Sequence, residues 1–243
     1  MKNQLKRPLA VVFDTDNTLY PYDFPHKAAL EAVARKASLM LGVSRDRFIS
    51  AFRRAREETK KRLEHTASSH SRLLYFQRTI EILTGKTQLL FTLDLEQTYW
   101  RTFLSRCVLF PGLLDFLEVL KKEGVATAIV TDLTSQIQFR KIIYFDLEQY
   151  FNYVVTSEES GLDKPDLLPF RLILEKLNIP PRDIWMIGDS AGNDVRGAKR
   201  AGMFAIQKLH AGVKKGTGES RADYYFRNYS QILSVFRKLV ARD

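Results

Sequence analysis

The feature that most constrains the fold is an apolar segment that ends in two acidic residues. The run from Ala10 to Phe13 is apolar at every position, which is typical of a central parallel strand that is buried on both faces. Asp14 and Asp16 follow at once, in the stretch VVFDTDNTLY, and no basic residue lies beside them. Because like charges at one site repel each other, these carboxylates require compensation from elsewhere in the fold.

From residue 108 onward, segments of strand and helix character alternate along the chain. Amphipathic helical segments separate predicted strands at 125–130, 153–156, 184–189 and 203–209. This alternation is typical of a parallel sheet with helices on both faces. Residues 26–105 have mostly the apolar spacing of helices instead, with Ser44 as the expected cap of a second helix, Gly85 at the end of a third, and a fourth helix expected over residues 95–104.

The fold class predicted from this order is α/β. We expect a Rossmann-like parallel-sheet core made of residues 1–20 and 108–243, with a helical insert, residues 21–107, after the first strand.

Charge and cysteine content limit the setting in which the protein works. Of the net charge of +10, residues 26–107 supply most, with 16 Lys and Arg against 8 Asp and Glu. Such a segment attracts an anionic substrate or another polyanion, or it is simply a solvated helical face. The single Cys107 fits a reducing compartment, and no stretch reaches the roughly 20 apolar residues of a membrane span. We expect a cytoplasmic protein.

Polar residues follow each predicted strand, and ligands of open parallel sheets bind at that edge. Thr131 follows the second strand, Lys164 lies in the loop after the third, and Asp189 and Asp194 come after the fourth. Together with the first two carboxylates, this set fits a hard cation such as Mg²⁺ and a phosphate group. We expect Asp14, Asp189 and the backbone carbonyl of Asp16 to be the Mg²⁺ ligands.

The same set permits a division of chemical roles. Asp14 would attack phosphorus as the nucleophile, and Asp16 would act as general acid and then as general base. Lys164 would offset charge on the transferring group, and the Thr131 hydroxyl would bind a phosphate oxygen.

Four segments of the chain resemble the motifs of the phosphatases in the haloacid dehalogenase superfamily. FDTDNTLY resembles the nucleophile motif DxDx(T/V). The segment IVTDLT, which contains Thr131, resembles the second motif, and GLDKPD, which contains Lys164, resembles the third. GDSAGNDVRGAKRAGM, residues 188–203, resembles the fourth motif. The resemblance implies a Mg²⁺-dependent phosphate-monoester hydrolase that forms an aspartyl phosphate. The helical insert lies where this superfamily places one class of cap, and the second Asp argues against a dehalogenase.

Several residues have secondary or open roles. Asp194 is expected to orient Lys164 or a metal-bound water rather than to ligate the metal directly. Asp132, where relatives often have Asn, either points away or contacts a substrate hydroxyl. His70 and Arg72, in a polar cluster of the insert, are either part of an exposed loop or contact the substrate. The substrate-binding set predicted is Thr131, Asp132, Lys164, His70 and Arg72.

The predicted function is hydrolysis of a small phosphate monoester of the nucleoside monophosphate, sugar phosphate or phosphoglycolate type. Two alternatives remain, a phosphomutase of the same superfamily and a binding protein that uses the basic insert on a polyanion. The expected partner is a small phosphorylated metabolite, with no membrane and no nucleic acid, and the protein is expected to be a monomer or a homodimer.

Overall fold

The computed structural model describes residues 5–241, and the chain divides into two compact units. One unit contains the chain up to Tyr20 and from Leu109 onward, and the other contains Pro21–Val108. We call them the core unit and the helical unit. Within the described residues, no helix combines the length and the apolar character that a membrane span requires.

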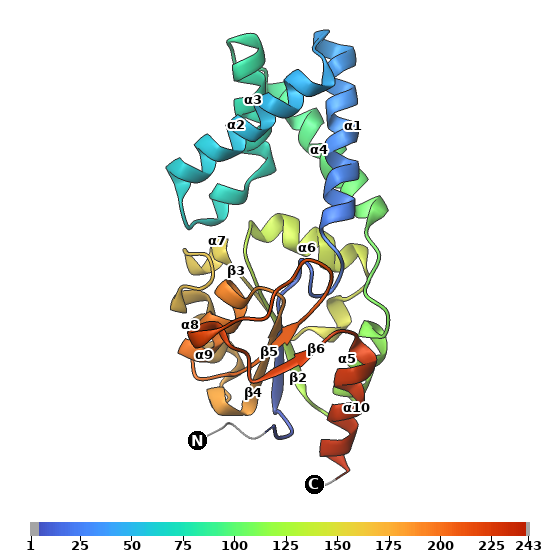
Figure 1. Cartoon of the computed structure of the whole chain (residues 1–243), viewed down its shortest axis with the longest axis vertical. Helices are drawn as coiled ribbons and strands as arrows, with labels where there is room; N and C mark the ends of the chain where they lie inside the picture. Colours follow the sequence, from blue (N-terminus) through green and yellow to red (C-terminus); the bar gives the residue numbers. More distant parts are fainter. Residues whose placement is uncertain (1–4, 242–243) are drawn as a thin grey trace. The chain divides into compact units, whose positions relative to one another are not determined.

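The core unit is built on a parallel sheet of six strands in the order β3-β2-β1-β4-β5-β6 (Figure 1). The strands are β1 Ala10–Phe13, β2 Ala126–Thr131, β3 Tyr153–Thr156, β4 Ile184–Gly188, β5 Phe204–Lys208 and β6 Tyr224–Phe226. The first strand lies in the middle of the sheet, and all four of its residues are buried, as expected for a strand covered on both faces. The predicted α/β fold is therefore confirmed.

Helices cover both faces of this sheet, and the side chains of β1 alternate between them. They are α5 Leu113–Lys122, α6 Ser135–Tyr144, α7 Ser157–Ser160, α8 Leu167–Leu177, α9 Arg196–Arg200 and α10 Tyr229–Val240. Val12 belongs to a buried cluster with Phe170 of α8. Phe13 points to the other face, where its ring meets that of Phe116 of α5 edge-on at 6.2 Å. These two layers fix the central strand from both sides.

Strand register brings three strand ends to one edge of the sheet. Phe13, the last residue of β1, is aligned with Ile129 of β2 on one side and with Ile187 of β4 on the other. The residues that follow β1, β2 and β4 therefore leave the sheet close together. This alignment is what positions the polar residues described below.

The helical unit contains four helices and one short 3₁₀ turn. These are α1 Asp23–Leu41, α2 Arg45–Leu63, the turn Ala67–His70, α3 Arg72–Thr84 and α4 Leu89–Arg106. Ser44 caps α2 by accepting a hydrogen bond from the Arg47 N–H, and Gly85 ends α3 in the left-handed conformation. Both helix ends lie where the sequence predicts them, at Ser44 and Gly85.

The fourth helix is longer than the sequence indicated. We expected it to cover residues 95–104, but it begins at Leu89. Leu89 and Leu90 are 73% and 86% exposed, so the first turn carries no buried stripe. Apolar periodicity reports only the buried part of a helix, and this turn was therefore missed.

Candidate active site

The candidate site lies at the carboxyl edge of the sheet in the core unit. Asp14 follows β1, Thr131 ends β2, and Asp189 follows β4. The Asp14 N–H donates to the carbonyl oxygen of Ile187 at 2.9 Å, which extends the β1–β4 ladder to the first acidic residue. The backbone at Asp14 is thus held as part of the sheet, while its side chain projects beyond the edge.

The Lys164 ammonium occupies the centre of the site. It donates to Asp14 Oδ1 at 2.6 Å, to Asp194 Oδ1 at 2.7 Å and to the Val130 carbonyl at 3.0 Å. Its side chain is only 2% exposed, so all three donors are directed into the protein. A buried ammonium is tolerated when its charge is paired and its protons are bonded, and both conditions hold here.

The charges around Lys164 keep it protonated. Burial alone would lower the pKa of Lys164, but Asp14, Asp194 and Asp132 raise it well above the ordinary value. The ammonium is therefore a permanent positive charge against the carboxylate of Asp14.

Asp194 can contact Lys164 because the residue that lies against its carboxyl group, Gly188, has no side chain. Its Oδ2 accepts from the Ser190 N–H at 2.9 Å, within the short helical turn Ala191–Val195 that follows β4. A Cβ on Gly188 would lie 2.4 Å from the Asp194 carboxyl group, so a larger residue there would displace it. The glycine that ends β4 thus permits the Lys164–Asp194 contact.

Three carboxylates of the site form a set of oxygen ligands for a cation. One oxygen from each of Asp14, Asp189 and Asp194 lies within 4.8 Å of the others. Burial is the largest cause that raises the pKa of Asp14 to about 7, and Asp194 and Asp16 add to it. Burial and then Asp194 and Asp14 likewise raise the pKa of Asp189 to about 8. Lys164 alone does not compensate this charge, and a hard divalent cation such as Mg²⁺ fits the donor set.

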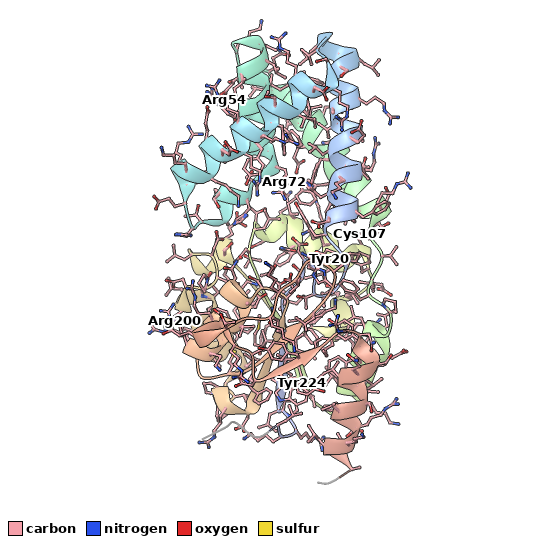
Figure 2. All side chains as sticks on the ribbon, in the orientation of Figure 1. Tyr20, Arg54, Arg72, Cys107, Arg200 and Tyr224 are labelled. Atoms are coloured by element: carbon pink, nitrogen blue, oxygen red, sulfur yellow. The ribbon has the colours of Figure 1, made fainter. Side chains whose placement is uncertain are left out.

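Asp16 is held by two residues that the sequence analysis did not select. Its Oδ1 accepts from the Lys141 ammonium at 2.8 Å and from the Tyr20 hydroxyl at 2.6 Å. Both donors are buried, with the Lys141 side chain 2% exposed, and Figure 2 labels Tyr20. The second carboxylate of VVFDTDNTLY thus has its own buried cation.

A weak signal for Lys141 is present in the sequence. In α6, Lys141 follows Gln138 by three residues and precedes Ile142, and all three lie on the buried side of the helix. A lysine that shares a helical face with buried residues is a candidate for a functional contact, although most such lysines extend to solvent.

The residues of the second motif are fixed by side-chain contacts. Thr131 Oγ1 lies 2.7 Å from Thr15 Oγ1 and accepts from Gln138 Nε2 at 2.9 Å. Asp132 Oδ1 accepts from the Lys164 N–H at 2.9 Å, and burial is the main cause that raises the pKa of Asp132. Asp132 therefore anchors the loop that carries Lys164, a role that the sequence analysis did not assign to it.

A third lysine, also missed, borders the site from β5. Lys208 is buried, its ammonium lies 3.2 Å from the centroid of the Phe110 ring, and burial lowers the pKa of Lys208 to about 8. Its ammonium is 3.5 Å from the Asn17 carbonyl oxygen. His210, two residues on, places Nε2 3.5 Å from Asp189 Oδ2.

The structure therefore groups most of the predicted residues and leaves two apart. The core unit brings together Asp14, Asp16, Thr131, Asp132, Lys164, Asp189 and Asp194. His70 and Arg72 belong to the helical unit, and their contact with a substrate stays a prediction. The alternative of an exposed loop at His70 is wrong in part, because His70 ends the 3₁₀ turn Ala67–His70, in which Ser69 is buried.

The raised carboxyl pKa values predict a specific dependence of stability on pH. Asp14 and Asp189 have ordinary pKa values of 3.8 and folded values of about 7 and about 8. The unfolded chain loses these protons at lower pH, so their contribution to metal-free stability falls as the pH rises from about 4 to about 8. Bound Mg²⁺ would offset the repulsion, and saturation at 100 times its Kd would stabilise the folded state by about 2.7 kcal/mol. Mg²⁺ should therefore raise the Tm more at pH 8 than at pH 5.

The control for this prediction is a pair of matched variants. Asp189→Asn should reduce the effect of Mg²⁺ at pH 8, whereas Asp115→Asn, at an exposed position of α5, should preserve it. An equal Mg²⁺ effect at both pH values, measured by calorimetry, would contradict the assignment of these carboxylates to a cation.

Comparison with known proteins gives a consistent family. Residues 8–202 match the model of the haloacid dehalogenase-like hydrolases. The chain is 38% identical to a ribulose-1,5-bisphosphate 5-phosphatase of Halopiger xanaduensis over 199 residues. The aligned region covers 81% of this chain and 83% of the relative. The chain is 25% identical over 230 residues to a glyceraldehyde 3-phosphate phosphatase of Methanocaldococcus jannaschii, which covers 94% and 97%.

A solved structure supports the same conclusion. The crystal structure of a HAD phosphatase from Thermococcus onnurineus is similar with a TM-score of 0.70 and 27% identity, over 93% of this chain and 96% of that chain. Together with the family match over most of the sequence, these likenesses show that the chain belongs to the haloacid dehalogenase-like hydrolase family and is a phosphatase of that family.

Proposed function

We propose that the protein is a Mg²⁺-dependent phosphatase that hydrolyses a small phosphorylated sugar through an aspartyl phosphate on Asp14. The observation that carries this proposal is the Lys164 ammonium, which joins Asp14 and Asp194 beside Asp189 at the sheet edge. Among the substrate classes expected from the sequence, sugar phosphates are favoured because two relatives are named as phosphatases of such compounds, ribulose-1,5-bisphosphate and glyceraldehyde 3-phosphate.

Asp14 is the proposed nucleophile. Lys164 donates to its Oδ1 at 2.6 Å and Thr18 donates to its Oδ2 at 3.2 Å, so the carboxylate is held in one orientation. A carboxylate oxygen forms the bond to phosphorus as the bond from phosphorus to the leaving oxygen breaks. The Lys164 charge then lies beside the phosphoryl oxygens, where charge accumulates.

Asp16 is the proposed acid and base. It gives a proton to the leaving oxygen in the first half-reaction and takes one from water in the second, and this water attacks the phosphorus of the aspartyl phosphate. The products are the dephosphorylated sugar, inorganic phosphate and the original Asp14 carboxylate. Tyr20 and Lys141, which both donate to Asp16 Oδ1, hold the carboxyl group in place for the two transfers.

Mg²⁺ would be held by Asp14, by Asp189 and by the backbone carbonyl of Asp16, with Asp194 acting through Lys164 or a water. When bound, it supplies positive charge to the carboxylates and to the phosphoryl oxygens. Thr131 is proposed to bind a phosphate oxygen, and its hydroxyl is oriented by Gln138 and Thr15. Asp132 accepts a hydrogen bond from the Lys164 backbone N–H and is proposed to hold the Lys164 loop in position. The helical unit is proposed to act as a cap that excludes water during the reaction.

The first test is phosphate release from a panel of small phosphate monoesters. Asp14→Asn should abolish release from every compound, because an amide is a poor nucleophile. EDTA should abolish it in the parent protein and Mg²⁺ should restore it. Asp115→Asn is the matched control at an exposed position and should keep full activity.

Two outcomes would count against the mechanism, unchanged release by Asp14→Asn and metal-independent release, whereas release of phosphate only from nucleotides would count against the proposed substrate class. The last would remove the sugar class and keep the chemistry. Transfer of the phosphoryl group to a second hydroxyl of the sugar, without free phosphate, would identify a phosphomutase instead.

The second test addresses Lys141. Lys141→Met removes the ammonium from Asp16, so kcat should fall by roughly 10- to 100-fold, less than the roughly 10²- to 10⁴-fold contribution of a complete general acid–base group because Asp16 itself remains. Lys141→Arg should recover part of this loss because it restores a cationic donor. Arg140→Met, at the exposed neighbouring position of α6, removes the same charge and should leave kcat unchanged. Steady-state kinetics measures kcat, and thermal melting checks that the variants fold. Equal kcat values in Lys141→Met and Arg140→Met would exclude a role for Lys141 in positioning Asp16.

A further inference from the structure

The turn that follows the two carboxylates of the first motif, residues 17–19, is held by segments far away in the sequence. The Thr18 carbonyl oxygen accepts from the Tyr229 hydroxyl at 2.8 Å. The Leu19 carbonyl oxygen accepts from the Phe110 N–H at 2.9 Å. All of these residues belong to the core unit. The position of the turn is therefore set by donors that lie outside the motif itself.

Thr18 connects this turn to the proposed nucleophile. Its hydroxyl donates to Asp14 Oδ2 at 3.2 Å, and Thr18 is completely buried. The hydroxyl and the carbonyl that binds Tyr229 belong to the same residue, so the backbone position that Tyr229 fixes also fixes where the hydroxyl points. Tyr229 thus acts on the orientation of the Asp14 carboxylate through a single intervening residue.

The place of the Tyr229 side chain is determined by its helix and by two neighbouring rings. Tyr229 is the first residue of α10, and the helix begins with a capping box in which Asn228 and Gln231 each bond the other's backbone N–H. The Tyr229 ring is completely buried, with centroids 6.0 Å from Phe116 and 5.3 Å from Phe226. The hydroxyl is therefore carried on a rigid support.

The Tyr229 hydroxyl keeps its proton. Burial and then the charge of Asp14 raise the pKa of Tyr229 well above its ordinary value. A buried phenol needs an acceptor for its proton, and the Thr18 carbonyl provides one. Loss of the hydroxyl would leave this carbonyl without that donor, which is a cost beyond the hydrogen bond itself.

Lys208, the last residue of β5, supports the residue at the start of the same turn. Its ammonium lies 3.5 Å from the Asn17 carbonyl oxygen and 3.2 Å from the centroid of the Phe110 ring, and the side chain is buried. Asn17 has a φ of 61°, in the left-handed region that asparagine adopts more readily than most residues. The three successive carbonyls of the turn are thus bound by donors from three different segments.

Both side-chain donors lie beyond the part of the chain that matches the family. The match ends at residue 202, whereas Lys208 and Tyr229 follow it. Tyr229 also begins a helix, so the pattern of polar residues after each strand does not point to it. The C-terminal segment therefore contributes contacts to the site that the four motifs do not contain.

We propose that Tyr229 is a positioning residue, whose hydroxyl fixes Thr18 so that Thr18 orients Asp14 for attack on phosphorus, with Lys208 supporting the same turn; this rests on the proposed function, in which Asp14 is the nucleophile. Tyr229 itself forms no bond to the substrate and transfers no proton.

The first measurement is the steady-state kinetics of Tyr229→Phe, which keeps the buried ring and removes only the hydroxyl. We expect kcat to fall by about three- to tenfold, the size of one ordinary hydrogen bond, with KM nearly unchanged because orientation of the nucleophile matters in the transition state. Tyr224→Phe is the matched control, at a partly buried tyrosine of β6 that Figure 2 labels, and should keep the parent kcat.

A double-mutant cycle distinguishes positioning from a general loss of structure. Thr18→Val removes the hydroxyl that contacts Asp14 and keeps the backbone carbonyl. If Tyr229 acts through Thr18, the double variant should lose no more kcat than Thr18→Val alone. Losses that multiply would show that Tyr229 acts independently of Thr18 and would overturn the proposal, as would an unchanged kcat in Tyr229→Phe.

Crystal structures of the parent and of Tyr229→Phe give a readout that needs no turnover. The hydroxyl of Thr18 should move away from Asp14 Oδ2 in the variant, and an unchanged contact would overturn the positioning role whatever the kcat. If the parent hydrolyses no phosphate monoester, the proposed function fails while this comparison still decides the contact. If Tyr229→Phe does not fold, Lys208→Met is compared instead, and an unchanged kcat and an unmoved turn overturn the proposal.

Discussion

The arrangement of the active site depends on one ion-paired ammonium. Lys164 is almost fully buried, and it remains charged because Asp14 and Asp194 both accept hydrogen bonds from it. Removal of Lys164 would leave the buried carboxylates of Asp14 and Asp194 without a counter-charge, which is strongly destabilising. The same contact orients the carboxylate that is proposed to attack phosphorus. Stability and chemistry at this edge of the sheet therefore rest on the same atoms.

Charge balance supports the proposal that the site binds a phosphate ester together with a cation. Asp14, Asp189 and Asp194 present more negative charge than Lys164 offsets, so a divalent cation would stabilise the group, and the cation would make the site attractive to phosphate. Asp16 stands apart because Lys141 gives it a cation of its own. Two carboxylates two residues apart thus have different surroundings, which is the condition for a nucleophile and an acid–base group to act side by side.

Residues at the strand ends were predictable because parallel strands bring their carboxyl ends to one edge, and a single register fixes which residues follow. Asp14, Thr131 and Asp189 were found in this way. Lys141 was not, because a lysine in an amphipathic helix usually reaches solvent, and only the tertiary fold shows that its ammonium meets Asp16. The start of α4 was missed for a related reason, since its exposed leucines lie outside the buried stripe. Sequence patterns predict which residues are buried and in which order the elements follow. Contacts between side chains that are distant in the sequence become apparent only in the folded structure.

The central claim is that a covalent aspartyl phosphate forms on Asp14, and chemical trapping tests it most directly. The protein is mixed with a hydrolysed sugar phosphate and Mg²⁺, quenched in acid and treated with borohydride, which reduces an acyl phosphate to an alcohol. Peptide mass spectrometry should then find homoserine in place of Asp14, only when substrate is present, and not in Asp14→Asn. Turnover with no change at residue 14, or with the modification at another carboxylate, would contradict the mechanism.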